Sequence, residues 1–577
     1  MLNQEIAKIF YEIADFLEMD DIPFRPNAYR KVAFVLDNLQ EDIEDIYLKG
    51  GIKSLDENVS GVGENIAKKI EEYIKTGRVK YLDQLKKKNP IDVEKLNAIE
   101  GLGPKRIKTL YQKLGIKNVK DLEKEIKAGR VSSLSGFGKK TEANLLEGIN
   151  FLRNTGGRFL LGDIAPIVDE IINELRKTKE IDKISVAGSV RRGKETVKDI
   201  DLLVVTKRPE KIMDAFVSLP SVVKIWGKGK TKSSVRMKMG FDVDLRVVPS
   251  KSYGSALQYF TGSKEHNIAT RKIAIGLGLK LNEYGVFKDK RSIAGSDEFG
   301  VYKALGMAYI EPELRENKGE IVAALENSLP RIVSFKDIKG DLHCHTEWSD
   351  GQNSIMEMTQ SGIKMGYKYI GITDHTIFLK VAYGLSEKKI LEQIIEIDKI
   401  NEIFKKKGID FTILKGAETN ILEDGSIDIS DKILSELDYA IAGVHSNFKM
   451  EKKNMTERII KAMRNPYVKI ISHPTGRILQ KRDEYSIDLE KVLLSAKKNN
   501  VILEINSNPV RLDFNDEHIK KAKKMGVKMV INSDSHNKDS LLNMKFGITQ
   551  ARRGWAEKED IINTFSLNNL LKFLKNK

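Results

Sequence analysis

The sequence predicts a chain of several domains: an all-helical N-terminal region, a mixed α/β region in the middle, and a parallel (β/α)7 barrel-like domain at the C-terminal end. Three observations lead to this prediction. Over residues 1–150, apolar side chains recur at helical spacing, with little clustering of β-branched residues. Over residues 158–315, runs typical of strands lie between helical stretches. From residue 339 onwards, seven strand candidates alternate with helical stretches.

Length and charge narrow the class of protein. A chain of 577 residues is long enough for several domains that each bury a core of their own. Lys and Arg outnumber Asp and Glu by 98 to 82, a formal net charge of +16. This excess favours a polyanionic partner, most simply nucleic acid. Solvated lysine-rich surfaces would give the same excess, so the charge alone leaves both interpretations open.

Cysteine and hydropathy patterns exclude two further classes. The only cysteine is Cys344, so no disulfide framework exists and we expect a reducing, cytoplasmic compartment. Residues 1–10 lack a basic segment followed by an apolar run, and we expect them to begin an amphipathic helix and not a signal peptide. No run of about 18 uncharged apolar residues occurs, so we expect no membrane span and no membrane partner.

A glycine-containing element recurs three times in the helical region. Each copy places a Gly-hydrophobic-Gly hairpin between two helical stretches and has lysines close behind it. The glycine pairs are Gly61 and Gly63, Gly101 and Gly103, and Gly136 and Gly138. Glycine permits a tight turn whose N–H groups, with the next helix N-terminus, can hold a phosphate. Three such helix-hairpin-helix elements predict sequence-independent binding of the DNA backbone.

The central region carries carboxylates on predicted strands at residues 201–205 and 241–248. Asp199 and Asp201 alternate, so both side chains point to one face of a strand. Like charges held this close are costly unless a cation lies between them. A third carboxylate, Asp242 or Asp244, lies on the other strand; these two also share a face, and spacing does not decide between them.

A predicted strand at residues 184–188 leads into a phosphate-binding pattern. Gly188 and Ser189 can offer backbone N–H groups and a hydroxyl to a triphosphate, and Arg191 and Arg192 supply charge-assisted donors. Three carboxylates beside a triphosphate are the ligands that two magnesium ions need for an in-line displacement. The central region therefore predicts a nucleotidyl-transfer site.

The C-terminal region places nine nitrogen and oxygen ligands where predicted strands end. These are His343, His345, Asp350, His375, Glu418, His445, His473, Asp534 and His536. In a parallel barrel the C-terminal strand ends meet on one face. A structural zinc site needs four ligands, whereas nine favour a catalytic cluster of two or three metals that cleaves phosphate esters. The many imidazoles favour manganese, zinc or iron over calcium.

Three residues near this cluster carry further expectations. Glu504 also falls at a strand end. Cys344 alternates with the two histidines beside it, so we expect it to point away from the ligands into the core. Arg477 follows His473 closely, and we expect it to contact a substrate phosphate.

The central region resembles the family X DNA polymerases, the family of DNA polymerase beta. The matching segments are Gly188-Ser189-Val190-Arg191-Arg192-Gly193, Asp199-Ile200-Asp201, Asp244-Leu245-Arg246-Val247-Val248-Pro249 and Tyr259-Phe260-Thr261-Gly262-Ser263. The resemblance implies that Asp199, Asp201 and Asp244 are the catalytic ligands of Mg²⁺ or Mn²⁺.

The same resemblance implies the residues that bind the incoming nucleotide. It implies Gly188, Ser189, Arg192 and Arg158 on the triphosphate, Tyr259, Phe260 and Gly262 against sugar and base, Asn267 on the minor-groove edge of the base, and Arg271 near the template strand. His266 stands where the family has an aromatic residue, which leaves the local packing open.

The N-terminal 80 residues resemble the small lyase domain of that family. The matching segments are Asn27-Ala28-Tyr29-Arg30-Lys31 and Gly61-Val62-Gly63-Glu64-Asn65-Ile66-Ala67-Lys68-Lys69-Ile70. The resemblance implies a DNA contact at Tyr29 and makes Lys69 the Schiff-base lysine, whose amine needs a lowered pKa to attack a sugar aldehyde. Arg25 and Asn65 stand where the family often has lysines, so a DNA contact without lyase chemistry stays open for Lys69.

The C-terminal region resembles the PHP (polymerase and histidinol phosphatase) domain, with every ligand position that can be aligned filled. Together the resemblances imply six segments. These are a lyase-like domain at 1–80, a helix-hairpin-helix subdomain at 81–150, a nucleotidyltransferase palm at 151–250, a nucleotide-selecting subdomain at 251–316, a linker at 317–338 and the PHP metallo-phosphoesterase at 339–577.

The expected function is that of a gap-filling DNA polymerase of base excision repair. Its PHP domain, with two or three Mn²⁺, Zn²⁺ or Fe ions, would act as a 3′–5′ exonuclease and an abasic-site endonuclease. The expected partners are gapped or nicked double-stranded DNA and dNTPs, bound by a monomer at the nucleoid. Two alternatives stay open: a DNA-binding nucleotidyltransferase whose PHP domain is a small-molecule phosphatase or a scaffold, and a template-independent nucleotidyltransferase.

Overall fold

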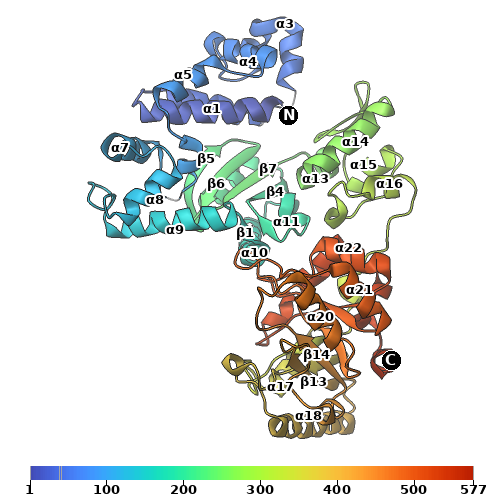
Figure 1. Cartoon of the computed structure of the whole chain (residues 1–577). Coiled ribbons are helices and arrows are strands. Elements are labelled where there is room, and N and C mark those ends of the chain that lie inside the picture. The colour runs from blue at the N-terminus through green and yellow to red at the C-terminus, as the bar shows by residue number, and fades with distance from the viewer. Residues whose placement is uncertain (1, 38, 40–41, 100, 576–577) are drawn as a thin grey trace. The chain divides into compact units, whose positions relative to one another are not determined.

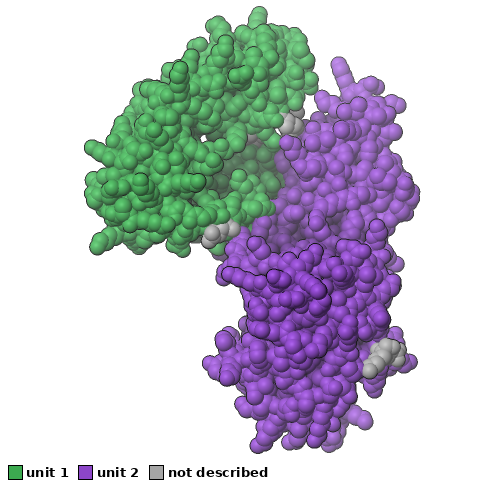
Figure 2. Space-filling view, in the orientation of Figure 1, with its two compact units in different colours: residues 1–159, 171–185, 198–248 green, residues 160–170, 186–197, 249–577 purple. Residues whose placement is uncertain are grey.

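A computed structural model describes residues 2–37, 39, 42–99 and 101–575 of the chain. The chain divides into two compact units, coloured separately in Figure 2. Unit 1 comprises residues 1–159, 171–185 and 198–248, and unit 2 comprises residues 160–170, 186–197 and 249–577. Among the described residues, no helix combines the length and the apolar character needed to cross a membrane.

The N-terminal part of unit 1 is helical, as predicted (Figure 1). Its helices are α1 (Leu2–Met19), α2 (Arg25–Asp37), α3 (Ile43–Asn58), α4 (Glu64–Thr76), α5 (Lys80–Lys88), α6 (Val93–Asn97), α7 (Pro104–Leu114), α8 (Val119–Lys127) and α9 (Lys139–Thr155). Apolar residues at helical spacing on α1, among them Ile6, Phe10 and Ile13, are fully buried and belong to one continuous core shared by these helices.

A five-stranded sheet completes unit 1, in the order β2-β4-β7-β6-β5. Its strands are β2 (Lys183–Val186), β4 (Asp199–Val205), β5 (Val222–Lys228), β6 (Lys232–Met237) and β7 (Asp242–Val247), and α12 (Pro209–Val217) packs on it. Strand β4 runs parallel to β7, and β6 runs antiparallel to its neighbours β5 and β7. The predicted first strand, 184–188, ends earlier than expected because Gly188 has φ +61° and begins α11 (Gly188–Arg191).

The first part of unit 2 is a smaller α/β body with its own core. Its elements are α13 (Tyr253–Thr261), α14 (Lys264–Gly276), the antiparallel strands β8 (Lys280–Asn282), β9 (Gly285–Lys288) and β10 (Arg291–Ala294), α15 (Glu298–Ala304) and α16 (Glu320–Leu325). Helix α16 lies inside the segment 317–338 that the sequence suggested as a linker, so part of that segment is helical. The short strands β1 (Phe159–Leu160) and β3 (Thr196–Val197) and the helix α10 (Leu161–Arg176) precede this body in the chain.

The C-terminal part of unit 2 is a seven-stranded parallel barrel, as predicted. Its strands follow in sequence order: β11 (Gly340–Cys344), β12 (Tyr369–Ile372), β13 (Thr412–Asn420), β14 (Tyr439–Gly443), β15 (Val468–Ile471), β16 (Ile502–Asn506) and β17 (Met529–Asn532). A parallel bridge from Cys344 to Ser535 joins the first strand to the chain just after the last one. The ring is therefore nearly closed.

In the chain, helices follow the strands; in space, they surround the barrel (Figure 1). They are α17 (Ile355–Lys364), α18 (Glu387–Lys407), α19 (Asp431–Leu434), α20 (Lys452–Ala462), α21 (Leu489–Lys498), α22 (Asp516–Met525), α23 (Met544–Arg553) and α24 (Leu567–Lys575). Cys344 is fully buried in the apolar layer that these helices share with the strands, which confirms its predicted place in the core. Leu570 and Leu574 of α24 pack against the other buried layer, formed by residues such as Leu342 and Ile441.

Candidate active sites and nucleic-acid interface

The nine predicted ligands of the C-terminal region come together at the carboxyl ends of the barrel strands. Their nitrogen and oxygen atoms form three groups, within each of which the ligand atoms lie no more than 4.8 Å apart. The groups are His345, Asp350, His375 and His536; His343, His345 and Asp534; and His375, Glu418 and His445. Because His345 and His375 each belong to two groups, the three groups adjoin one another. His473 lies beside them, with its Nε2 3.1 Å from Oε1 of Glu418.

The histidine rings of this cluster present unpaired nitrogens. Among the described residues, ring nitrogens of His343, His345, His375, His445 and His473 are buried without a hydrogen-bond partner. A buried polar atom without a partner is costly, so such a group of nitrogens needs a bound species to complete it. Imidazole nitrogens together with carboxylate oxygens are the donor set of catalytic transition-metal sites. The residues present therefore fit divalent metal ions.

The carboxylates of the cluster are held ionised by the imidazoles. Burial alone would raise the pKa of Glu418, but His343, His445 and His375 outweigh it and hold that pKa well below its usual value. Asp534 behaves in the same way, because His343, His345 and His536 surround it. Burial lowers the pKa of His345 to about 3, and the neighbouring His536 and His375 add to this effect. A neutral His345 is the form that can bind a metal.

Residues around the ligands orient the rings. Glu504 lies 2.7 Å from Nδ1 of His343, and it also accepts hydrogen bonds from the amide of Asn532 (2.9 Å) and from the backbone N–H of His473 (2.7 Å). Asn420 lies 2.8 Å from Nδ1 of His445. Such partners set the orientation and basicity of a ligand histidine. Glu504 stood out in the sequence only by its place at a strand end. Asn420 was missed, and the signal that could have found it is its period-two spacing from Glu418.

The positions of two arginines were not predicted correctly from the sequence. Arg477 was expected at a substrate phosphate, but its Nη2 lies 2.5 Å from Oε1 of Glu195 and also donates to the carbonyl of Leu512. This guanidinium is therefore engaged by protein groups, which corrects the prediction. Arg511 was missed; its Nε lies 3.7 Å from Oδ2 of Asp534, at the edge of the ligand cluster.

In unit 1, the carboxylates of the five-stranded sheet meet across β4 and β7. The register pairs Asp201 with Asp244 and Asp199 with Asp242. Asp242 is engaged by Arg236, with two contacts of 2.6 and 2.9 Å, and by the indole N–H of Trp226 at 2.8 Å. Asp244 instead faces Nζ of Lys232 at 3.2 Å. The geometry favours Asp244 over Asp242 as the third metal ligand, a choice that spacing alone had left open.

The three remaining carboxylates repel one another. Burial and the charge of Asp244 raise the pKa of Asp199. Burial raises the pKa of Asp201 to about 7, and the charges of Asp244 and Asp199 add to this effect. The positive charge of Arg158 opposes the rise in the pKa of Asp199, but more weakly than burial and Asp244 cause it. Neighbouring carboxylates that raise one another's pKa form a site that a divalent cation would relieve.

In unit 2, most residues expected at the nucleotide lie close together. Arg192 donates to the carbonyl of Thr261 and lies 3.1 Å from Glu316, while a Cβ on Gly262 would lie 3.2 Å from the Arg192 guanidinium. The side chain of Asn267 donates to the carbonyl of Tyr259 at 2.7 Å.

Two aromatic rings extend this group. The rings of Tyr259 and Phe260 meet edge to face, and Arg271 lies 5.7 Å from the centre of the Tyr259 ring. Arg191, by contrast, forms a bidentate pair with Glu298, at 2.6 and 2.8 Å, and supports the fold. The structure therefore gathers Arg192, Tyr259, Phe260, Gly262, Asn267 and Arg271 around one place.

His266 fits its position through a buried polar network. Its ring is fully buried, with Nδ1 2.8 Å from Glu320 and Nε2 2.9 Å from the hydroxyl of Tyr302. Glu320 also accepts the backbone N–H groups of Asn317 and Lys318, at 2.8 and 2.7 Å. The histidine thus fills the place of the family's aromatic ring and ties α14 to α16.

The segment that carries Gly188, Ser189 and Arg192 also contacts α23 of the barrel, inside unit 2. Arg553 donates to the backbone carbonyl of Arg192 (2.8 Å) and lies 3.1 Å from Glu316 and 2.6 Å from Asp516. Gln550 donates to Glu195 at 2.7 Å. Thr549 lies so close to Gly193 that a side chain at this glycine would collide with it. Helix α23 therefore packs against the predicted triphosphate-binding segment and supports it.

The surroundings of Lys69 suit either of its two expected roles. Its Nζ donates to the carbonyl of Asn65 at 3.0 Å and lies 5.1 Å from the centre of the Tyr81 ring. Burial lowers the pKa of this amine, and the charge of Arg25 lowers it further. Tyr29, predicted to contact DNA, is only 4 % exposed and stacks on Tyr81. This corrects the prediction for Tyr29, whose ring is part of the core beneath Lys69.

The three glycine hairpins have the same geometry. Gly61, Gly101 and Gly136 have φ of +82°, +83° and +85°, a region that only glycine enters readily. In each hairpin the central apolar residue is buried and its N–H donates three residues back, at 3.0 or 3.1 Å. Gly63, Gly103 and Gly138 then begin α4, α7 and α9 without a side-chain cap. Each hairpin therefore ends at a helix N-terminus whose first N–H groups have no side-chain cap and can bind a phosphate.

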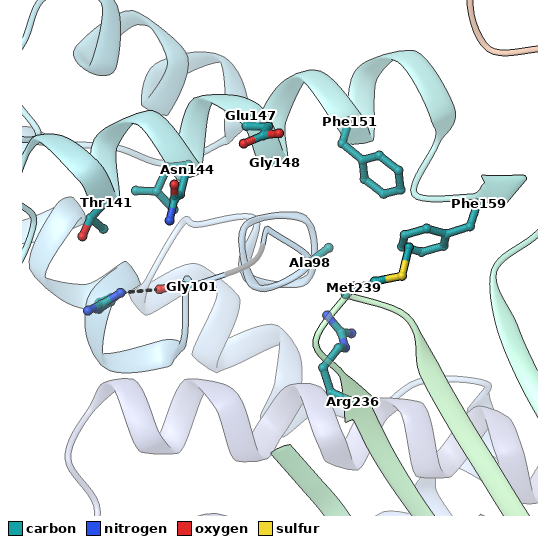
Figure 3. Close-up of a pocket in the computed structure, with 13 residues that line it drawn as sticks. Ala98, Gly101, Thr141, Asn144, Glu147, Gly148, Phe151, Phe159, Arg236 and Met239 are labelled. Atoms are coloured by element: carbon teal, nitrogen blue, oxygen red, sulfur yellow. Dashed lines mark hydrogen bonds between the residues drawn. The ribbon is translucent and has the colours of Figure 1, made fainter. Parts of the chain in front are cut away.

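A cavity of about 490 Å³ lies beside the second hairpin in unit 1. Figure 3 shows Phe151, Phe159 and Met239 at one end of it, and Thr141 and Asn144 towards the other. Arg106 closes the hairpin by donating to the carbonyl of Gly101 at 2.8 Å. Its guanidinium thus stabilises the turn that immediately precedes α7.

Family comparisons agree with this geometry. Residues 1–79 match a helix-hairpin-helix domain, residues 93–150 a SAM-like helix-hairpin-helix tandem, residues 256–316 the DNA polymerase beta thumb and residues 341–508 the PHP domain. The DNA polymerase/3′–5′ exonuclease PolX of Bacillus subtilis (strain 168) is 38 % identical over 582 residues, which cover 100 % of both chains.

Shorter relatives match the barrel. A probable phosphatase of Thermoanaerobacter sp. (strain X514) is 32 % identical over 41 % of this chain and 94 % of its own length. A probable phosphatase of Clostridium acetobutylicum is 31 % identical over 34 % of this chain and 78 % of its own length. The full-length match, together with the thumb, helix-hairpin-helix and PHP domains, decides the family. The chain belongs to the family X DNA polymerases, in the group that joins a DNA polymerase to a PHP domain with 3′–5′ exonuclease activity.

Proposed function

We propose that this polymerase fills short gaps in DNA during base excision repair and that its PHP domain trims the 3′ end. The observation that carries the first half is the facing pair Asp201 and Asp244, with Asp199 beside them and Asp242 engaged elsewhere. These three carboxylates would hold Mg²⁺ or Mn²⁺. The bound ions would lower the pKa of the attacking 3′-hydroxyl and stabilise the leaving diphosphate.

The chain's own residues would bind and orient the nucleotide. The backbone of Gly188, the hydroxyl of Ser189 and the guanidinium of Arg192 would hold the triphosphate, with Arg158 as a further donor. Arg192 now pairs with Glu316, so an incoming phosphate would compete with that carboxylate for the guanidinium. Tyr259, Phe260 and Gly262 would contact sugar and base, Asn267 would contact the minor-groove edge, and Arg271 would approach the template.

The nine-ligand cluster would cleave the 3′ end, and also abasic sites. Its imidazoles and carboxylates suit two or three ions of Mn²⁺, Zn²⁺ or Fe, which would supply an activated water and stabilise charge on the phosphate. Glu504 would keep the His343 ring aligned, and Asn420 would do the same for His445. The unpaired, buried ring nitrogens are the observation that supports a working site over a scaffold.

The helical region would hold gapped or nicked double-stranded DNA. The three hairpins would bind backbone phosphates through Gly61 and Gly63, Gly101 and Gly103, and Gly136 and Gly138. Lys69, whose pKa is lowered by burial, would attack the sugar aldehyde at the 5′ side of the gap. We further propose that the chain acts as a monomer, at the nucleoid in the cytoplasm, with the six segments inferred from the sequence as its domains.

Two assays on the full-length chain test this proposal. Purified protein should extend a primer by one templated nucleotide on a one-nucleotide gap, with Mg²⁺ or Mn²⁺ present; incorporation that ignores the template base would contradict it. The double variant His343→Ala/His345→Ala should lose 3′ degradation by at least about 1000-fold, because two ions lose ligands, while synthesis stays near wild type. Degradation that persists in this variant would contradict the assignment to the PHP cluster.

A second candidate function for the PHP cluster is hydrolysis of small phosphate esters. The shorter relatives named as probable phosphatases favour it. The two candidates differ in substrate: an exonuclease needs a DNA chain with a 3′ end, whereas a phosphatase releases inorganic phosphate from monoesters. Comparing kcat/KM for a 3′-hydroxyl oligonucleotide and for a phosphate monoester at equal metal concentration separates them.

A further inference from the structure

The loop that follows the ligand His375 exposes an unusual number of large apolar side chains. Within this rim loop, residues 376–384, the exposed fractions are 50 % for Ile377, 46 % for Phe378, 89 % for Val381 and 75 % for Tyr383. Lys380, between them, is also exposed. Soluble proteins seldom gather exposed apolar side chains without a binding partner. We therefore expect the exposed side chains of the rim loop to contact a binding partner.

The rim loop starts and ends at the metal-ligand cluster. The backbone N–H of Leu385 donates to the carbonyl of His375 at 2.7 Å, and the N–H of Thr376 donates to the carbonyl of Glu418 at 3.2 Å. Ala382 and Leu385 are buried and anchor the loop from below. Because both ends of the loop are bonded to ligand residues, its exposed side chains belong to the rim of the metal site.

The loop has a defined conformation. Tyr383 has φ +55°, in the left-handed region, which costs a non-glycine residue about 1 kcal/mol. Its N–H nevertheless donates to the carbonyl of Lys380 at 3.1 Å, within a short 3-10 turn (Lys380–Ala382). Strain that is retained in an exposed residue points to a function for the side chain held there.

One polar network connects the rim loop to a second ligand. Asp428 accepts the backbone N–H of Phe378 at 3.2 Å and the hydroxyl of Thr376 at 2.7 Å. The amide of Asn420 donates to Asp428 at 2.8 Å, and its oxygen lies 2.8 Å from Nδ1 of His445. The same side chains therefore position the rim loop and a metal-binding histidine.

A third aromatic residue, Phe448, lies just after His445. The guanidinium of Arg482 lies 3.7 Å from the centre of the Phe448 ring, and its Nε donates to the carbonyl of Gly476 at 2.8 Å. His375 and His445 both follow parallel strands, so the chain after each leaves the barrel at its C-terminal face. Aromatic rings and cations thus accompany two of the ligand histidines.

We propose that this rim binds the unpaired nucleotides at a DNA 3′ end. Bases would stack on the exposed rings of Phe378 and Tyr383, while Lys380 and Arg482 would meet backbone phosphates. Aromatic rings combined with cations are the means by which proteins hold single strands without reading sequence, because every base has a stacking face. A paired end keeps its bases in the duplex stack and offers no such face. The rim would thus make unpaired 3′ ends the preferred substrate.

This proposal rests on the proposed assignment of 3′ cleavage to the PHP cluster. The double variant Phe378→Ser/Tyr383→Ser, made in the full-length chain with Mn²⁺, tests it. We expect KM for DNA with an unpaired 3′ overhang to rise about tenfold, and the preference for unpaired over paired 3′ ends to shrink by a similar factor. Phe378→Tyr, which keeps an aromatic ring, should retain most of the wild-type KM.

Two controls accompany this variant. Ile395→Ser removes an apolar side chain of α18 that is 53 % exposed, comparable to Phe378, and should leave KM and the preference for unpaired ends unchanged. Hydrolysis of the p-nitrophenyl ester of thymidine 5′-monophosphate reports on the metal site alone, because this ester is too short to cover the rim. The effect on DNA should exceed the effect on this ester at least fivefold.

Several results would overturn the proposal. An unchanged KM and an unchanged preference in the Phe378→Ser/Tyr383→Ser variant would do so, and would leave a protein segment as the occupant of the patch. An equal loss on DNA and on the small ester would also do so, because the loop would then serve only to support the metal site.

A binding assay separates this failure from a failure of the proposed function. In a His343→Ala background, 2-aminopurine at an unpaired 3′ terminus should be quenched on binding, and the two serine substitutions should reverse the quenching. This readout needs no cleavage, so it tests binding at the rim even if another site degrades the 3′ end. Quenching that the serine substitutions do not change would contradict the proposal.

Discussion

The five-stranded sheet of unit 1, which we call the palm, and the barrel of unit 2 both bring carboxylates together. The side chains that surround those carboxylates differ between the two. In the palm, Asp199, Asp201 and Asp244 face one another, and burial with mutual repulsion raises the pKa of Asp201 to about 7. In the barrel, imidazoles surround Glu418 and Asp534 and hold their pKa values well below normal. The palm site therefore depends on an added cation for its ionised form, whereas the barrel site is largely compensated by its own histidines.

The largest expected effect distinguishes two neighbouring carboxylates of the palm. Asp244→Asn should reduce synthesis on gapped DNA by at least about 1000-fold, because a metal ligand is lost. The matched control is Asp242→Asn, two residues away on the same strand, which removes only the partner of Arg236 and Trp226 and should cost less than about tenfold. Steady-state primer extension measures both. Equal losses would mean that the contacts of the two carboxylates do not identify the metal ligand.

The second prediction concerns pH and metal-free stability. Asp201 has a folded pKa of about 7 against an ordinary value of 3.8, so it favours the folded state at low pH. That contribution is complete below pH 4 and is lost as the pH rises to 7, by about 2 kcal/mol after screening by water. The metal-free wild type should therefore lose more stability between pH 5 and pH 8 than Asp201→Asn does.

Thermal unfolding in chelator measures this difference, and Mg²⁺ should remove it by neutralising the carboxylates. The barrel offers the opposite case, because its carboxylate pKa values are lowered and their contribution is lost on acidification. If wild type and Asp201→Asn follow the same pH profile without metal, the carboxylate repulsion inferred for the palm is wrong.

The third prediction tests the compensation in the barrel. Glu418→Gln should destabilise the metal-free barrel by about 3 kcal/mol, because His343 and His375, whose pKa values are raised, lose the charge that balances them in a buried site. Hydrogen exchange of β13 and its neighbours, followed in the full-length chain, reports the loss locally. Neutralising a palm carboxylate should instead raise the free energy of unfolding of the metal-free protein. A barrel that is stabilised by Glu418→Gln would therefore contradict the difference inferred between the two sites.

The smallest expected effect concerns the contact between α23 and the triphosphate segment. Arg553→Ala should raise the KM for dNTP about tenfold with a smaller change in kcat, because Arg553 holds the Arg192 backbone and shares Glu316 with it. Lys545→Ala, at an exposed position of the same helix, is the control. Loss of kcat and KM together, or of 3′ degradation as well, would indicate a folding defect of α23 instead.

Patterns with a short period predicted the local structure of this chain. The seven barrel strands appear where apolar runs predicted them, because a buried parallel strand needs a continuous apolar segment whatever packs around it. The glycine hairpins were equally predictable, since a positive φ at Gly61, Gly101 and Gly136 is a local requirement. The strand ends, where the ligands stand, followed from the same patterns.

Side-chain partners from distant segments were not predictable in this way. Tyr29 is buried because Tyr81, far along the chain, stacks on it. Arg477 is engaged because Glu195, on another segment of unit 2, lies 2.5 Å away. Neither contact leaves a trace in local spacing, so neither the family resemblance used for Tyr29 nor the closeness of Arg477 to His473 in the chain revealed it.

The sequence by itself predicted the order of the helical, mixed α/β and barrel regions, the glycine hairpins, and which nine side chains come together at the strand ends. These depend on periodicity and on residue type, which act over a few positions. Only the tertiary structure decided that Arg236 and Trp226 engage Asp242 while Asp244 faces Asp201 and Lys232, that Glu504 and Asn420 align the ligand histidines, and that the rim loop exposes Phe378 and Tyr383. Those outcomes depend on distances between segments far apart in the chain, and burial and charge act through distance.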